Sequence, residues 1–142
     1  MVGKGYGLSP SASINRGGVR LRERVVLALN DTVLAAWMGR QLRRLGWAVH
    51  STRSGEEARQ LCREHSPQVV VLDTRLKDQS GWLICEKVLR DDPTLKVILF
   101  ASQSEANDEA FAQFVGPAKL IRQLQGSQAV IDEIVATASL VR

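Results

Sequence analysis

The sequence predicts an α/β domain in which a five-stranded parallel sheet carries helices on both faces. Two observations support this fold class. Short apolar runs, typical of strands buried on both faces, alternate with longer stretches in which apolar residues recur at helical spacing. The segments follow the order strand, helix, strand, helix throughout, which is typical of parallel strands joined by crossover helices. A chain of 142 residues has room for one such domain.

Five segments are expected to form the strands. The clearest is the run Val69 to Leu72, four consecutive aliphatic residues that end on Asp73. An unbroken run of this kind is typical of a central strand, because a half-exposed strand would alternate with polar residues. The segment 47–52 is shorter and more polar, which suits a sheet edge. The other strands are expected at 24–29, 95–101 and 118–123.

Five helices are expected to connect and follow these strands. Ser54 and Glu57 fit a capping box, in which the hydroxyl and the carboxylate satisfy free amides at the start of a helix. Gly46 and the pair Gly116–Pro117 mark the ends of two helices. Apolar residues at helical spacing predict helices over 32–45, 55–62, 82–89, 105–115 and 128–141.

The basic charge of the chain lies in its first residues. The formal net charge is +4, and residues 1–24 hold five Lys or Arg against one Glu, which accounts for all of it. Residues 1–23, rich in Gly and Ser, are expected to form a flexible leader, and residues 24–142 the folded domain. The basic segment is short, the rest of the chain has no net charge, and no aromatic residues alternate with the basic ones. This pattern does not indicate specific nucleic-acid binding.

The sequence also argues against a membrane-spanning protein and against a secreted one. No apolar run approaches the roughly 18 residues needed to span a bilayer, and no signal peptide opens the chain, so a cytoplasmic protein is expected. Cys62 and Cys85 fall inside helical patterns and form no CxxC pair. Free buried thiols are therefore expected, in preference to a disulfide or a metal site.

Polar residues follow two strands of the predicted sheet at the point where each strand ends. Asn30 and Asp31 follow the first strand, and Asp73 ends the third. In a sheet of order 2-1-3-4-5 these two ends meet at the crevice where such folds bind ligands. A lone Asp after a strand equally fits a turn cap, but two carboxylates in one crevice favour binding of a hard cation such as Mg²⁺.

With these residues in view, the chain from about Arg24 to Val141 resembles the receiver domain of two-component response regulators. The resemblance rests on Asn30–Asp31, on the segment Asp73 to Gly81 with its glycine eight residues beyond the aspartate, and on the element spacing. It implies a flavodoxin-like fold and a non-enzymatic signalling role. It also implies that Asp73 accepts a phosphoryl group from a histidine kinase or phosphotransfer protein. Mg²⁺ would be bound by Asp31, Asp73 and the backbone carbonyl of Arg75.

The sequence departs from the family pattern at several positions. Asn30 stands where an acidic residue is usual, which implies a weakened metal site with Asn30 as a weak or indirect ligand. Ala101 stands where the family has a hydroxyl residue, and Ser102 follows one position after it. Leu120 stands in place of an aromatic residue and Gln123 in place of a lysine. A hydrogen bond to a charged group contributes about 1.5–3 kcal/mol, and switching a two-state domain takes roughly 5.5 kcal/mol. A phosphate on Asp73 is therefore expected to switch the domain weakly.

Two further expectations concern a substitute cation for the phosphate and the surface that binds a partner. Lys77 or Arg75, in the loop beside Asp73, could supply a substitute cation for an acyl phosphate. A downstream protein partner is expected to use the surface formed by 105–115, Leu120 and 128–141, the face that receivers commonly use.

Three hypotheses of function remain open. The first is a stand-alone receiver phosphorylated on Asp73 with Mg²⁺. The second is a degenerate receiver that binds partners without phosphoryl chemistry. The third, an enzyme with a carboxylate pair, is the weakest, because no nucleophile or histidine joins the site. His50 and His65 are expected on the edge strand and in a turn, with surface roles.

Overall fold

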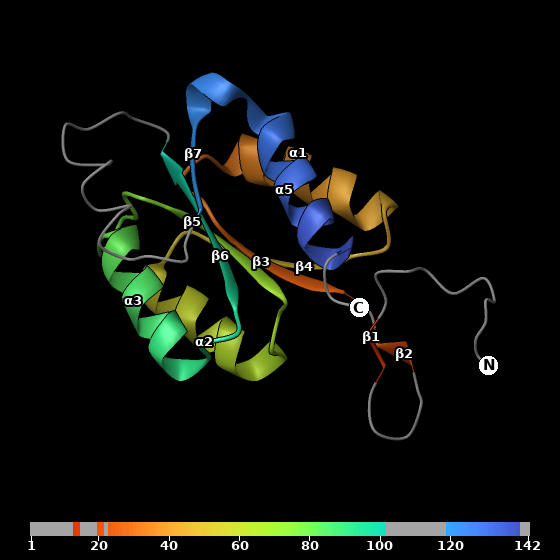
Figure 1. The fold of residues 1–142 in the computed structure, drawn as a ribbon. Helices are drawn as coiled ribbons and strands as arrows, with labels where there is room; N and C mark the ends of the chain where they lie inside the picture. Colours follow the sequence, from red (N-terminus) through yellow and green to blue (C-terminus); the bar gives the residue numbers. More distant parts are fainter. Residues whose placement is uncertain (1–12, 15–19, 22, 102–118, 140–142) are drawn as a thin grey trace.

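A five-stranded parallel sheet forms the centre of the protein, as a computed structural model shows (Figure 1). The structure describes residues 13–14, 20–21, 23–101 and 119–139. The strand order is β4-β3-β5-β6-β7, which confirms the predicted order 2-1-3-4-5. The strands are β3 (Arg24–Ala28), β4 (Ala48–Thr52), β5 (Val69–Asp73), β6 (Lys96–Ala101) and β7 (Lys119–Arg122).

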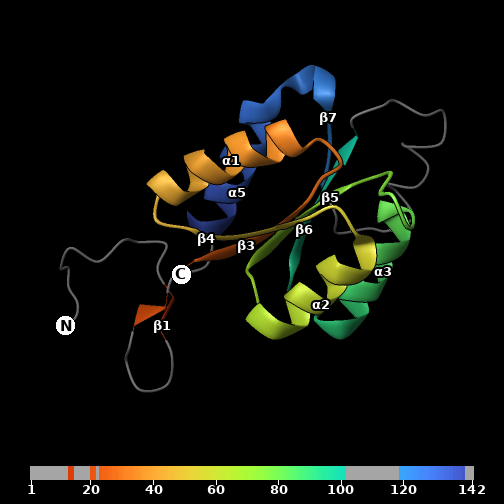
Figure 2. The ribbon, with the colours of Figure 1, turned by 180° about the vertical axis from the view of Figure 1, so that it is seen from behind.

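Helices cover both faces of this sheet. The helices α1 (Thr32–Arg44) and α5 (Ser127–Ser139) lie on one face, and α2 (Gly55–His65) and α3 (Gly81–Asp91) on the other (Figures 1 and 2). A short 3₁₀ helix, η1 (Gln123–Gln125), leads from β7 toward α5. The helix predicted over 105–115 lies outside the described residues, as do Ser102 and residues 140–141 of the last predicted helix.

The core is divided by the sheet into two clusters. Side chains of a strand point alternately to its two faces, so Val69 and Val71 of β5 pack under α1 and α5, while Val70 and Leu72 pack under α2 and α3. All five residues of β5 are buried. This explains the unbroken apolar run in the sequence, because a strand in the middle of a covered sheet has no solvent face.

Outside the main sheet, two short strands pair near the start of the chain. β1 (Ser13–Ile14) and β2 (Arg20–Leu21) are antiparallel, with Ser13 opposite Leu21. No pattern in the sequence indicated this pairing. The division into a leader over 1–23 and a domain over 24–142 stays a prediction.

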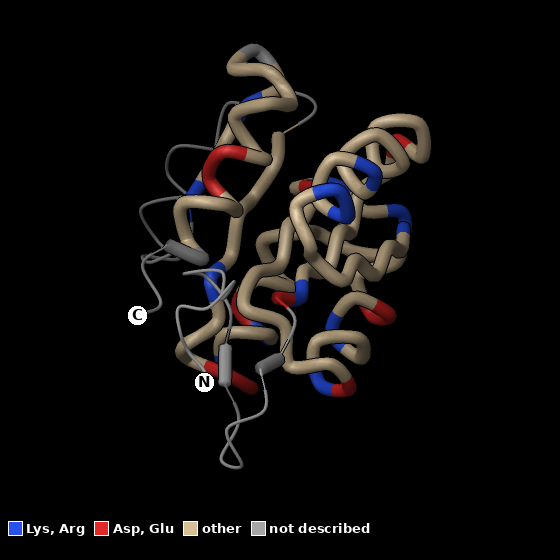
Figure 3. Tube along the Cα trace, turned by 90° about the vertical axis from the view of Figure 1, so that its right-hand side faces the viewer, with Lys and Arg blue, Asp and Glu red and all other residues tan. Residues whose placement is uncertain are grey.

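Three further features of the described residues concern helix length, the cysteines and the basic residues. No helix among them is long and apolar enough to cross a membrane. Cys62 and Cys85 are both free thiols, and Cys85 is fully buried while Cys62 is half-buried. Basic residues gather on α1, whose last turns carry the exposed Arg40, Arg43 and Arg44 and whose sequence contains no acidic residue (Figure 3).

Candidate functional site

The C-terminal ends of β3 and β5 bring the predicted site residues together. The two strands are neighbours, and their register sets Ala28 beside Leu72. Asn30 and Asp31 therefore follow β3 at the same edge of the sheet at which Asp73 ends β5. Asp73 is almost completely buried, with 1% of its surface exposed. Asp31 is exposed at the start of α1. One carboxylate of the predicted site is therefore buried and the other is open to solvent.

Asp31 is held in place by the helix that it caps. Its Oδ1 accepts hydrogen bonds from the backbone N–H groups of Val33 and Leu34, each at 3.0 Å. These are two of the amides that the first turn of a helix leaves without a partner. The structure thus gives Asp31 a structural role in addition to its predicted role as a metal ligand.

The loop between β5 and α3 folds back over the end of β5. The Arg75 N–H donates to Asp73 Oδ1 at 3.0 Å. The side-chain amide of Asn30 donates to the Arg75 carbonyl. This carbonyl is the backbone group predicted to bind Mg²⁺, and in the structure it already accepts a hydrogen bond from the chain. Asn30 is thus bonded to the predicted ligand itself.

Gly81 allows this loop to lie directly on the strand end. A Cβ at position 81 would lie 2.0 Å from the Asp73 carbonyl oxygen and 2.9 Å from Thr74 Cα. The Gly81 N–H donates to the Thr74 carbonyl at 2.9 Å. The spacing of eight residues between Asp73 and Gly81 therefore has a steric cause, because α3 begins in contact with the backbone of Asp73.

Asp78 joins the same loop to the start of α2. Its carboxylate accepts hydrogen bonds from the Gly55 N–H at 2.8 Å, the Ser54 hydroxyl at 2.9 Å and the Glu56 N–H at 3.1 Å. Desolvation by burial opposes ionisation of Asp78, but these hydrogen bonds outweigh it and hold the pKa of the carboxyl well below its usual range. Sequence reasoning missed this residue, because its partners are more than 20 positions away.

The predicted capping box at α2 is present only in part. The Glu57 N–H donates to the Ser54 hydroxyl at 3.1 Å, as predicted. The Ser54 N–H, however, donates to Thr52 Oγ1 at 3.0 Å. The Glu57 carboxylate accepts a hydrogen bond from the Thr52 hydroxyl. The Thr52 hydroxyl, at the end of β4, therefore bonds to both members of the box.

The atypical switch positions lie on β6, on β7 and at the start of η1. Ala101 is buried at the end of β6, Leu120 is half-buried in β7, and Gln123 is exposed as the first residue of η1. The predicted strand thus ends one residue earlier, at Arg122, which is in register with Ala101.

Lys77 and Arg75, the predicted substitute cations, both have exposed side chains in the loop between β5 and α3.

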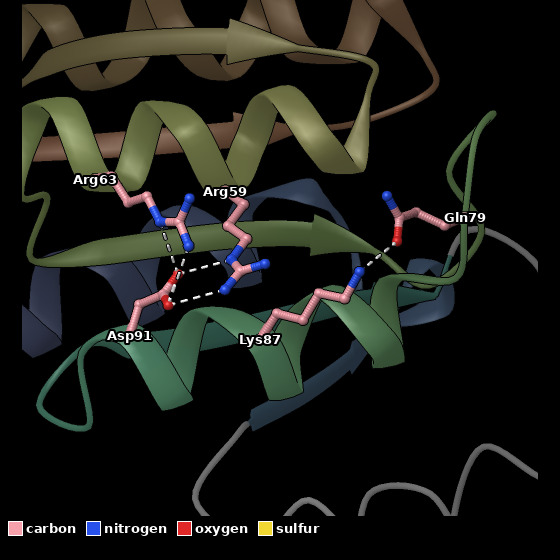
Figure 4. A network of polar contacts seen from close by, with 5 residues as sticks. All are labelled: Arg59, Arg63, Gln79, Lys87 and Asp91. Atoms are coloured by element: carbon pink, nitrogen blue, oxygen red, sulfur yellow. Dashed lines mark hydrogen bonds and ion pairs between the residues drawn. The ribbon is translucent and has the colours of Figure 1, made fainter.

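A neighbouring polar network connects the helices α2 and α3 (Figure 4). The Asp91 carboxylate of α3 pairs with Arg59 at 2.8 Å and with Arg63 at 3.3 Å, both from α2. Lys87 Nζ of α3 lies 3.4 Å from Gln79 Oε1 of the loop.

The donor set suits a hard cation with few protein ligands. Within the described ranges, no three or more His, Cys, Asp or Glu side chains gather as a metal-binding group. Asp31 and Asp73 provide two carboxylates, and Mg²⁺ is commonly held by one or two carboxylates together with water and phosphate oxygens. Close by, the Thr74 hydroxyl is buried and has no hydrogen-bond partner among the described residues.

Neither histidine joins this site. The rings of His50 in β4 and His65, the last residue of α2, stack with centroids 3.8 Å apart. His65 therefore ends a helix, where a turn was expected.

Comparison with known proteins gives a consistent family assignment. The family model described as response regulator receiver domain matches residues 25–136. The "Probable transcriptional regulatory protein TcrX" of Mycobacterium tuberculosis is 32% identical over 84 residues, which cover 59% of this chain and 36% of that protein. The "Polar-differentiation response regulator DivK" of Brucella ovis is 37% identical over 65 residues, covering 42% of this chain and 53% of that protein. The matches thus span between about a third and a half of these relatives.

Solved structures support the fold. A "response regulator receiver domain protein (CheY-like)" from Methanospirillum hungatei superposes with a TM-score of 0.76 at 17% identity, covering 83% of this chain and 94% of that one. The chemotaxis protein CheY4 of Vibrio cholerae superposes with a TM-score of 0.72 at 11% identity, covering 82% and 99%. At such identities the likeness concerns the fold alone.

Proposed function

The chain belongs to the response regulator receiver domain family, and from this premise we propose that it accepts a phosphoryl group on Asp73. The observation that carries the proposal is the position of Asp73: a buried carboxylate at the end of the central strand, at the same edge of the sheet as Asn30 and Asp31. A carboxylate oxygen of Asp73 would attack the phosphorus of a phosphohistidine. A phosphorus–oxygen bond would form as the phosphorus–nitrogen bond of the donor breaks, leaving an aspartyl phosphate.

We further propose that Asp31 and Asp73 hold Mg²⁺ at this site. When bound, the cation would offset the negative charge that gathers between carboxylate and phosphoryl oxygens. Asp31 supports this role because its position is fixed by the first turn of α1. Asn30 lowers the expected affinity in two ways, because it adds no charge and its amide bonds to the Arg75 carbonyl.

Lys77 and Arg75 are proposed as substitute cations for the phosphate. Both belong to the loop that follows Asp73, and both side chains are exposed to solvent. Their proximity in sequence and their position in the same loop support the proposal.

A second candidate function is a receiver that binds partners without phosphoryl chemistry. Ala101 and Gln123 favour it, because neither can supply the hydroxyl or ammonium group that would bond to a phosphate and move the adjoining loop. If Asp73 is phosphorylated, the phosphoryl donor would be a histidine kinase or phosphotransfer protein. In both cases the output partner is proposed to bind the surface of 105–115, Leu120 and 128–141. A cytoplasmic location, a stand-alone role and the absence of enzymatic activity stay predictions.

Intact-mass measurement after incubation with Mg²⁺ and acetyl phosphate separates the two functions. The parent protein is expected to gain one phosphate, and Asp73→Asn none. Asp132→Asn, at an exposed site on α5, is the matched control and should be labelled like the parent. If the parent gains no phosphate under conditions that label another receiver, the phosphorylation proposal is wrong and the second candidate stands.

A further inference from the structure

Two side chains from distant parts of the chain hold the loop that follows Asp73. Near its start, the Asn30 amide donates to the Arg75 carbonyl across a sequence separation of 45 residues. Near its end, Asp78 binds the first amides of α2. The loop also closes on itself, because the Leu76 N–H donates to the Gln79 carbonyl at 3.2 Å and Arg75 bridges to Ser80.

The chemical type of residue 30 decides how the first of these contacts can form. A carboxylate at this position would place an acceptor opposite the Arg75 carbonyl, which is itself an acceptor. Two acceptors at close range require a cation or a water molecule between them. The amide of Asn30 is a donor, so the connection between β3 and α1 bonds directly to the loop after β5.

We propose that Asn30 is a positioning residue that holds the loop after Asp73 closed without a divalent cation, in competition with any cation for the Arg75 carbonyl. The proposal deepens the proposed function, because this loop belongs to the proposed phosphoacceptor site. Any Mg²⁺ that binds would then meet a loop already in place, and it would change the conformation of the loop little.

Hydrogen exchange measured by mass spectrometry tests the proposal directly. The amides of Arg75, Leu76 and Gly81 all donate within the loop or to Asp73, so their exchange reports loop opening. In the parent protein, the segment 74–81 should exchange at the same rate in EDTA and in millimolar Mg²⁺. Asn30→Ala should exchange roughly fivefold faster in EDTA, as expected for the loss of one ordinary hydrogen bond.

The decisive variant is Asn30→Asp. It should exchange faster than the parent in EDTA, and Mg²⁺ should slow it back toward the parent rate, because a cation can then bridge the two oxygens. A residue with a merely structural role would show no such rescue. Gln60→Ala, at an exposed position of α2, is the control and should match the parent in both buffers.

Exchange of the buried strand β6 serves as an internal reference, so that a general loss of stability can be divided out. The proposal is wrong if Mg²⁺ slows the loop of the parent protein severalfold, or if Asn30→Ala leaves the rate in EDTA unchanged. No phosphodonor is present in the experiment. A failure here therefore leaves the phosphorylation of Asp73 open, and a failure to phosphorylate Asp73 leaves the Asn30 contact standing.

Discussion

Gly81 occupies a position where a single methyl group cannot be accommodated. A Cβ there would overlap the Asp73 carbonyl oxygen at 2.0 Å, and the backbone of a central strand cannot move aside. Gly81→Ala is expected to lower the free energy of unfolding by about 1–3 kcal/mol, the usual cost of overpacking. Urea denaturation followed by circular dichroism would measure the change.

Gly39 supplies the matched control for this substitution. It lies inside α1, and a Cβ there would approach the flexible end of Arg43 at 3.0 Å and make an ordinary contact with Val49 Cγ1 at 3.8 Å. Gly39→Ala should leave stability unchanged or raise it by about 0.5–1 kcal/mol, because alanine is the better helix former. Equal losses in the two variants would contradict the steric account of Gly81.

His50 gives the protein a pH dependence near neutrality. Burial lowers the pKa of His50, and the stacked His65 together with Arg24 and Arg43 lowers it further, while Glu64 opposes the shift. Because the folded pKa lies below the unfolded value of about 6.5, the unfolded chain binds more protons in the window just below that value. Stability is therefore complete above this pH and is lost as the pH falls.

The measurement is the melting temperature between pH 7.5 and 5.5. It should fall with pH in the parent protein, and it should fall less in His50→Gln, which keeps a planar polar side chain but cannot titrate. Arg44→Gln, at an exposed position of α1, is the control and should keep the parent slope. A parent melting temperature that rises on acidification would contradict the sign.

Asp78 connects two elements, the loop after β5 and the helix α2. Replacement by Asn leaves one acceptor oxygen where the carboxylate oxygens accept three hydrogen bonds. Asp78→Asn is expected to lower the free energy of unfolding by about 1–2 kcal/mol at pH 7, as for the loss of a helix cap. Thermal unfolding of parent and variant at a series of pH values would test both the size and the pH dependence.

The pH dependence follows from the lowered pKa of Asp78. The stabilisation is present above the unfolded value of about 3.9 and is lost as the pH falls through the folded value. The difference between parent and Asp78→Asn should therefore be constant from pH 5 to 7 and shrink below pH 4. Asp92→Asn is the control, since the Asp92 carboxylate bonds within its own turn, where it accepts from the Thr94 N–H at 3.0 Å and the Thr94 hydroxyl at 2.6 Å. An equal loss in both variants would argue against the special role of Asp78.

At the scale of elements, sequence patterns predicted those features that depend on local chemistry. The unbroken run of β5 predicted a central strand, and helical spacing predicted α1, α2, α3 and α5, because burial imposes these periods on the chain. The patterns missed contacts between distant segments. Asp78 capping α2 and Asn30 bonded to Arg75 each join residues that only the tertiary fold brings together.

At the scale of the whole molecule, three strand ends must act together if a phosphate on Asp73 is to change the output surface. The register sets Asp73 beside Phe100 and Ala101 beside Arg122, so β5, β6 and the turn at Gln123 share one edge of the sheet. Two hydrogen bonds of about 1.5–3 kcal/mol each would supply much of the roughly 5.5 kcal/mol that switching requires. In this chain Ala101 carries no hydroxyl and Gln123 carries no ammonium group.

Restoring both groups should therefore extend the response across the sheet. In the parent protein, beryllofluoride with Mg²⁺ is expected to change the fluorescence of Trp82, which follows Gly81 at the site, while the hydrogen exchange of β7 and α5 stays the same. In the double variant Ala101→Thr with Gln123→Lys, the exchange of β7 and α5 should change as well. Gln128→Lys, at an exposed position in the first turn of α5, controls for added charge. If β7 and α5 of the parent already respond as strongly as those of the double variant, the sheet edge does not need these two groups, and weak switching is the wrong description of this receiver.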